Sequence, residues 1–160
     1  MELQIIQANF HNPQHAEHLL ELLDMYARDP MGGGEPLSEY VRQNLIQELN
    51  NLPHAVSLLA YYQHQPVGVL NGFMGFSTFR CKPLLNIHDI AVRPEHRGLG
   101  IARALLDKAE HIARQRGCGK LTLEVLEGNH NAQKLYRAAG YAGYALDPQM
   151  GHALFWEKHL

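Results

Sequence analysis

The chain has 160 residues, of which 46% are hydrophobic and 19% charged, and its formal net charge is −2 at pH 7. This length suits one globular domain, and the composition excludes disordered, collagen-like and disulfide-rich classes. The near-neutral charge argues against a nucleic-acid partner, and no apolar run is long enough to cross a membrane. The N-terminus lacks the basic and apolar regions of a signal peptide, so we expect a cytoplasmic protein.

The eleven histidines and two cysteines are scattered along the chain. They form neither the HExxH nor the CxxC pattern of zinc ligands, so no metal site is expected. No internal repeat or linker interrupts the sequence, and residues 1–160 are therefore expected to form a single α/β domain.

Helices and strands are expected to alternate, since apolar residues change repeatedly between helical and strand spacing. Capping residues and glycines mark the helix ends. In chain order we expect a strand over 3–8, a helix from Asn12-Pro13 to Pro30, a glycine loop over 32–34, a helix capped by Ser38, strands over 55–62, 67–76 and 84–92, a helix from Ile101 to Gly117, a strand over 121–126, a helix over 131–139 and a strand over 153–159.

The most informative stretch covers residues 90–102, where a strand ends, a loop turns and a helix begins. The first N–H groups of such a helix lack intrahelical partners and carry the positive end of its dipole. Gly98 and Gly100 let the backbone approach an anion closely, Ala102 keeps the first turn slim, and Arg97 adds a positive charge. The pattern predicts a pyrophosphate-binding loop.

Other glycine loops fit this stretch less well. A P-loop requires Gly-Lys-Ser/Thr, which is absent, and a dinucleotide-binding fingerprint requires a third glycine where Arg103 stands. The structural alternative is a tight turn that only leads into the helix.

Two motifs resemble those of the GNAT superfamily of acyl-CoA N-acyltransferases. The first motif of that family is Arg/Gln-x-x-Gly-x-Gly/Ala, and the second is Asn-x-x-Ala-x-x-x-Tyr-x-x-x-Gly-aromatic. The matching residues are Arg97, Gly100 and Ala102 in the first motif, and Asn129, Ala132, Tyr136, Gly140 and Tyr141 in the second. The match is close over the second half of the chain, and the order of elements extends it to the whole.

The resemblance implies a GNAT fold, in which a mixed central sheet with splayed parallel strands is flanked by helices. It also implies that acetyl-CoA binds between the strands over 84–92 and 121–126. The residues that this assigns to the cofactor are Ile90, Ala91 and Val92 through their backbone, Arg97, Gly98, Leu99, Gly100, Ile101 and Ala102 around the pyrophosphate, and Asn129 and Ala132 on the other side.

In the family, the amine attacks the thioester directly and a tyrosine protonates the leaving thiolate. Tyr136 matches that general acid, and its alternative role is a packed helix aromatic.

Two residues are candidates for the base. Glu124 resembles the base of the ribosomal-protein N-acetyltransferases, or else is a paired or solvated sheet residue. His88 has a suitable reference pKa near 6.5, and strand alternation puts it on the face of Ile90 and Val92, or else it is a hydrogen-bonded core histidine.

Residues 75–89 resemble the diamine and polyamine N-acetyltransferase branch. Where that branch has a Glu-Asp pair, this chain has His88-Asp89, which removes one carboxylate. Asp89 and Glu35, together with Asp29, are candidates for binding an acceptor ammonium, and the alternative for Glu35 is a solvated loop residue.

We therefore expect an acetyl-CoA-dependent N-acetyltransferase that acts on a primary amine of a small molecule. Acetylation of a protein or peptide N-terminus or lysine is one alternative, and a catalytically silent CoA-binding regulator is another. The apolar strand expected over 153–159 indicates a homodimer or, alternatively, burial within the monomer.

Overall fold

The computed structural model describes residues 2–160, so Met1 of the expected single domain lies outside the described residues. The chain forms two compact units, one ending at Leu123 and the other covering Glu124–Leu160. The single domain over 1–160 therefore stays a prediction, and each unit is described by itself.

The first unit is built on a five-stranded sheet with the spatial order β1-β2-β3-β4-β5. All neighbouring strands are antiparallel except β4 and β5, which are parallel. The strands are β1 (Leu3–Gln7), β2 (Ala55–Tyr62), β3 (Gln65–Ser77), β4 (Lys82–Val92) and β5 (Lys120–Leu123). This arrangement confirms the mixed α/β fold expected from the sequence.

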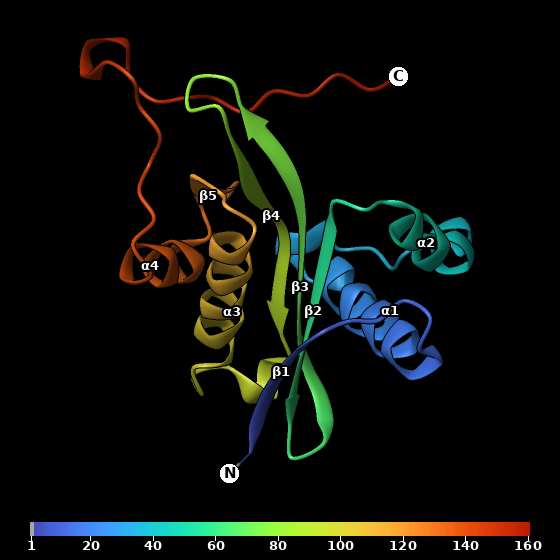
Figure 1. The fold of residues 1–160 in the computed structure, drawn as a ribbon. Coiled ribbons are helices and arrows are strands. Elements are labelled where there is room, and N and C mark those ends of the chain that lie inside the picture. Colours follow the sequence, from blue (N-terminus) through green and yellow to red (C-terminus); the bar gives the residue numbers. More distant parts are fainter. Residues whose placement is uncertain (1) are drawn as a thin grey trace. The chain divides into compact units, whose positions relative to one another are not determined.

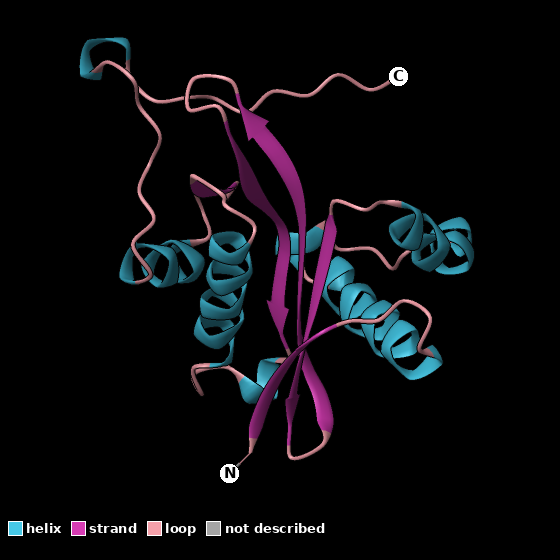
Figure 2. Cartoon of the chain, viewed as in Figure 1, coloured by secondary structure: helices cyan, strands magenta, loops and turns pink. Residues whose placement is uncertain are grey.

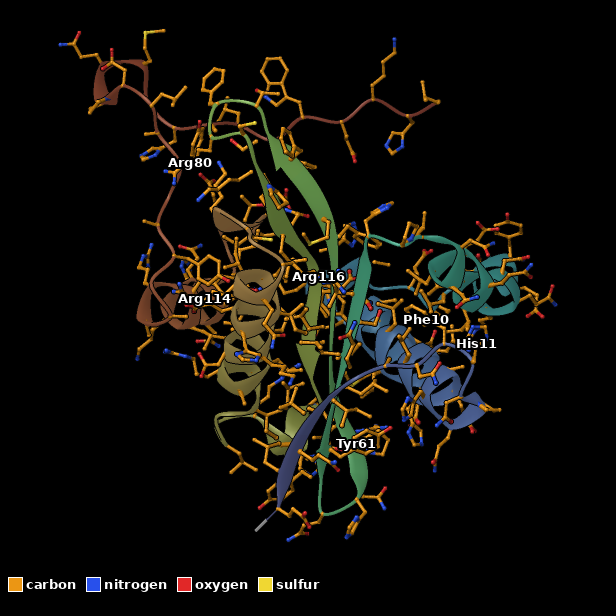
Figure 3. The ribbon with its side chains drawn as sticks, in the orientation of Figure 1. Phe10, His11, Tyr61, Arg80, Arg114 and Arg116 are labelled. Atoms are coloured by element: carbon orange, nitrogen blue, oxygen red, sulfur yellow. The ribbon has the colours of Figure 1, made fainter. Side chains whose placement is uncertain are left out.

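Helices cover both faces of this sheet. Helices α1 (Pro13–Arg28) and α2 (Glu39–Asn51) lie on one face, and α3 (Ile101–Gln115) lies on the other (Figure 1). The core under α1 and α2 contains Leu19, Leu22 and Leu59, and Phe10 packs against it from the loop before α1 (Figure 3). On the α3 side, the residues at helical spacing that are buried include Ile101, Leu105, Ala109 and Ile112.

Side chains cap the N-termini of three helices. The Asn12 side chain accepts hydrogen bonds from the first turn of α1, and Ser38 caps α2 in the same way, as their residue types predict. In the second unit Asn129 caps α4 (His130–Ala138). Helix α3 differs because its N-cap is Gly100 and no side chain caps it.

Two expected strand assignments are wrong. Strand β5 ends at Leu123 and not at Leu126, so Glu124 lies beyond it. No strand forms over 153–159, and Figure 2 draws this segment as loop. A strand needs a partner to form its ladder, and apolar composition alone does not supply one. The side chains of Leu154, Phe155 and Trp156 are exposed, so burial within the monomer is wrong for them, and the homodimer stays a prediction.

No helix within residues 2–160 has the length and apolar character needed to cross a lipid bilayer.

Asp24 ties α1 to α2 and to the loop between them. Its Oδ1 accepts hydrogen bonds from the Leu37 N–H (2.9 Å) and from Arg42 Nη2 (2.6 Å), and its Oδ2 accepts one from Arg28 Nε (2.9 Å). Burial acts to raise the pKa of Asp24, but the hydrogen bonds from Arg28, Leu37 and Arg42 outweigh it and lower the pKa. The ionised carboxylate therefore holds this corner of the fold together.

Replacing Asp24 by asparagine should lower the free energy of unfolding at pH 7 by roughly 1.5–3 kcal/mol, as expected for hydrogen bonds to a charged group. Because the pKa of Asp24 is lowered by folding, its contribution is present at neutral pH and is lost as the pH falls below the ordinary aspartate range. Urea unfolding at pH 7, 5 and 3 should show a constant gap between wild type and Asp24→Asn at the two higher pH values and a smaller gap at pH 3.

Asp107→Asn is the matched control, because Asp107 forms an exposed pair with Arg103 within α3. Its effect should stay within about 0.5 kcal/mol at every pH. Equal losses in the two variants would refute the special role of Asp24.

Candidate active site

Strand β4 loses its parallel neighbour halfway along its length. The pairing with β5 runs from Leu84 opposite Lys120 to Ile87 opposite Leu123, and β4 then continues to Val92 paired with β3 only. The register with β3 shifts at the same point, because Asn71 faces Asp89 and Gly72 faces Ile87. His88 is thus the extra residue of a β-bulge at the place where the two parallel strands separate.

The backbone of β4 beyond the bulge presents hydrogen-bonding groups to this open edge. The Arg93 N–H donates to the Val67 carbonyl, which fixes the alternation of hydrogen-bonded pairs along β3 and β4. By this alternation Ile90 and Val92 direct their backbone groups away from β3. Ala91 was also expected to offer its backbone to the cofactor. That expectation is wrong, because the Ala91 carbonyl faces β3, where it lies 3.3 Å from the point that a Cβ on Gly68 would occupy.

The predicted pyrophosphate loop connects this strand to α3. Gly98 and Gly100 both have φ of +78°, which favours glycine, and a Cβ at either position would meet no atom within 4 Å. Residues Gly98, Leu99 and Gly100 are exposed, whereas Ile101 is buried and anchors the helix. Because no side chain caps α3, its first N–H groups, including that of Ala102, are oriented to bind an anion.

Arg97 connects this loop to the end of α1. Its Nε donates a hydrogen bond to the Val92 carbonyl (3.2 Å), and its Nη2 lies 3.5 Å from Asp29 Oδ2. The guanidinium is thus held beside the open edge of β4 and neutralises Asp29.

A cavity of ≈ 340 Å³ lies on the sheet face covered by α1 and α2. Its walls are mainly aliphatic and aromatic side chains from both helices and from β3, and its polar groups come from α1, β3 and β4. The lining residues are Leu23, Tyr26, Ala27, Gly32, Leu37, Val41, Leu45, Leu49, Asn71, Phe73, His88 and Asp89.

The polar groups from the sheet form one hydrogen-bonded chain that ends in the cavity. The buried Ser57 Oγ donates to Asn71 Oδ1 (2.6 Å), and Asn71 Nδ2 donates to Asp89 Oδ2 (3.1 Å). Asp89 Oδ1 lies 3.1 Å from His88 Nδ1. The network satisfies polar groups within the sheet and holds the Asp89 carboxylate in a defined position.

The bulge moves His88 to the other face of the sheet from the one predicted. Ala91 packs against the core under α1 and α2, so alternation puts Ile90 and Val92 on the opposite, α3 side. His88 instead lines the cavity under α1 and α2, where its ring lies edge-on to Phe73 at 5.8 Å. Its side chain is 64% exposed, so it is not a core histidine.

Of the three predicted carboxylates on the acceptor side, Asp89 alone lines the cavity. Asp29 pairs with Arg97, and Glu35 is exposed outside the lining.

Asn71 and Tyr26 were not predicted. The sequence signal available for Asn71 was an asparagine within the otherwise apolar run 67–76. Tyr26 gave no such signal, because its spacing is that of any residue on the buried face of its helix. Burial, followed by the charges of Asp89 and Asp29, raises the pKa of Tyr26 and keeps its phenol neutral.

The second unit holds the remaining candidates. Asn129 Oδ1 accepts a hydrogen bond from the Ala132 N–H (3.2 Å), so these two motif residues together form the start of α4. Tyr136 on α4 is buried, and its ring centroid lies 6.0 Å from that of Tyr141. Glu124 is exposed.

The chain is similar in sequence to known acetyltransferases. The chain is 45% identical over 80 residues to streptothricin acetyltransferase from Streptomyces lavendulae, a match that covers 50% of this chain and 42% of that relative. The chain thus spans less than half the length of that relative. It is 26% identical over 135 residues to thialysine N-epsilon-acetyltransferase from Caenorhabditis elegans, which covers 81% of this chain and 78% of that one.

The fold itself also occurs in a solved structure, AAC(6')-Iy in complex with the bisubstrate analog CoA-S-monomethyl-acetylneamine. The TM-score is 0.75 at 20% identity, and the match covers 100% of both chains. A family model, described as the acetyltransferase (GNAT) family, matches residues 17–141. The chain therefore belongs to the GNAT acetyltransferase family.

Proposed function

We propose that this protein transfers an acetyl group from acetyl-CoA to a primary amine of a small molecule, by direct attack of the amine on the thioester. One observation carries the proposal: a single strand, β4, contributes to the cavity, to an open edge and to the loop that leads into α3. Residues 88 and 89 of β4 line the cavity, Ile90 and Val92 turn their backbone to the open edge, and the anion-binding loop follows directly.

The observed backbone fits a pantetheine-pyrophosphate ligand. Bound acetyl-CoA supplies an activated acetyl thioester. Ile90 and Val92 would hydrogen-bond the pantetheine arm as an added strand. The N–H groups from Gly98 to Ala102 would bind the pyrophosphate at the uncapped start of α3. Asn129 and Ala132, which the family motif assigns to the cofactor, lie in the second unit.

His88 is the base that the geometry favours. An ammonium acceptor with an ordinary pKa near 10.4 must lose a proton before it can attack. In the neutral tautomer whose Nδ1–H donates a hydrogen bond to Asp89, His88 Nε2 carries no proton. This nitrogen can then take a proton from the substrate amine. Asp89 would also stabilise the imidazolium that results. Glu124 remains the second candidate.

Tyr136 would act as the general acid. The amine nitrogen forms the new bond to the acetyl carbon, the carbon–sulfur bond breaks, and the phenol proton passes to the leaving sulfur. The substrates in the printed names of the relatives, streptothricin and thialysine, support a small-molecule acceptor.

Gly100→Ala should weaken acetyl-CoA binding by about tenfold or more, because one lost charge-assisted hydrogen bond to phosphate is worth roughly 1.5–3 kcal/mol. An added Cβ stands where the phosphate would approach, and the φ of +78° disfavours alanine. Isothermal titration calorimetry with acetyl-CoA measures the effect.

Gly117→Ala controls for the strain, since Gly117 follows the C-terminal end of the same helix with φ of +72° and open space around its Cβ position. Both variants should lose comparable stability, of about 1–2 kcal/mol. Acetyl-CoA affinity that is unchanged in Gly100→Ala, or reduced equally in both, would argue against the pyrophosphate assignment.

Tyr136→Phe should lower turnover by roughly 10²–10⁴-fold and leave acetyl-CoA affinity unchanged, because only the proton donor is removed. Thiol release is measured across diamines, polyamines, amino acids, aminoglycosides and short peptides, with a no-amine control to subtract the signal of Cys81 and Cys118. Tyr144→Phe, which alters an exposed tyrosine of the same unit, should keep full activity.

Release with peptides alone would assign the protein to protein acetylation. Tight acetyl-CoA binding without release for any amine would favour a silent regulator. Turnover that survives in Tyr136→Phe would remove Tyr136 as the acid.

A further inference from the structure

We propose that the acceptor is a monoamine whose single ammonium is attached to an apolar chain or ring, and that amines with a second positive charge are disfavoured. This inference rests on the proposed function and names the substrate class of the same cavity.

The walls of the cavity are built for apolar groups. Leu37, Val41 and Leu45 line it from α2 and the segment before it, and Leu23 and Phe73 line it from α1 and β3. None of these five side chains offers a hydrogen bond, so polar substituents of an acceptor would find side-chain partners only at Tyr26 and at the end of the cavity formed by Asn71, His88 and Asp89. The volume of ≈ 340 Å³ is near the lower end of the ~300–1,000 Å³ typical of ligand pockets, which favours a compact apolar group.

Arginines pair with two further carboxylates, one on α1 and one just beyond its end. Asp24 accepts hydrogen bonds from Arg28 and Arg42, and Asp29 pairs with Arg97. Neither carboxylate is available to a ligand without giving up an internal ion pair.

Asp89 is the one carboxylate among the residues that line the cavity within the described part of the chain. Its hydrogen bonds come from the neutral amide of Asn71 and from His88, and its side chain is 17% exposed. The buried Ser57–Asn71 pair fixes its position. The site therefore provides one negative charge, at the end of the cavity where the proposed base lies.

One ammonium can be compensated in this arrangement and a second cannot. The first ammonium would lie beside Asp89 and His88, with its chain against the leucine walls. A second ammonium on the same chain would then lie among apolar side chains with no counter-charge, which is unfavourable for a desolvated ion.

The direct test compares a linear alkyl monoamine with the diamine of the same carbon number, and phenylethylamine with a multiply charged aminoglycoside. In each pair, wild-type kcat/KM from thiol release is expected to be about tenfold or more higher for the monoamine. The reason is that the second ammonium of the other amine has no counter-charge in the cavity.

A charge-insertion variant sharpens the test. Val41→Glu puts a second carboxylate into the cavity wall and should raise kcat/KM for the diamine relative to the monoamine by about tenfold. Gln47→Glu adds the same charge on an exposed position of α2, outside the lining, and should leave the ratio unchanged. If Val41→Glu does not fold, the wild-type comparison still decides.

The outcomes separate this inference from the proposed function. Equal or higher wild-type kcat/KM for the diamine or the aminoglycoside would overturn the inference and leave the acetyltransferase proposal intact. Acetyl-CoA binding without release for any amine would overturn both. A diamine ratio that rises equally in Val41→Glu and Gln47→Glu would show that long-range charge, and not the cavity wall, sets the preference.

Discussion

The separation of β4 from β5 after Ile87 is the constraint on which the rest of the site depends. A parallel strand that loses its neighbour leaves a row of backbone groups to be satisfied, and here that row spans the second half of β4. The bulge at His88 comes at the same point and turns that side chain onto the opposite face. The two irregularities at this point thus leave an open edge along β4 and bring a histidine–aspartate pair into the cavity.

Such an arrangement is stable only if its buried polar groups are satisfied. The chain from Ser57 through Asn71 to Asp89 does this for Ser57 and Asn71, the two buried polar residues of the sheet within the described chain. Outside the sheet, Asp24 fastens the loop between α1 and α2, and Arg97 links the anion-binding loop to Asp29 at the end of α1. An ion pair therefore connects the loop proposed to bind the cofactor with the end of α1, which lies beside the proposed acceptor cavity.

Local signals made much of this fold predictable. Asn12 and Ser38 are capping residues whose function depends on the next turn alone, and the spacing of Ile101, Leu105, Ala109 and Ile112 specifies one helix face. Gly98 and Gly100 are likewise local signals for the start of α3, which no side chain caps. The two motifs indicated the family on residues alone.

Features that depend on tertiary pairing were not predictable in this way. The face of His88 was predicted by simple alternation, which a bulge interrupts, and the bulge is defined only by the register with β3. Apolar residues over 153–159 suggested a strand, but no ladder partner pairs with them. The ion pair between Arg97 and Asp29 joins residues far apart in the chain, so this partner of Asp29 could not be predicted.

Amide hydrogen exchange along β4, followed by NMR with and without acetyl-CoA, tests the central claim most directly. In the free protein the Ala91 amide, which faces β3, should be protected, whereas the amides of Ile90 and Val92 should exchange faster. Saturating acetyl-CoA should slow exchange at Ile90 and Val92 and leave Ala91 nearly unchanged. Saturation with no added protection at Ile90 and Val92 would contradict the assignment of this edge to the cofactor.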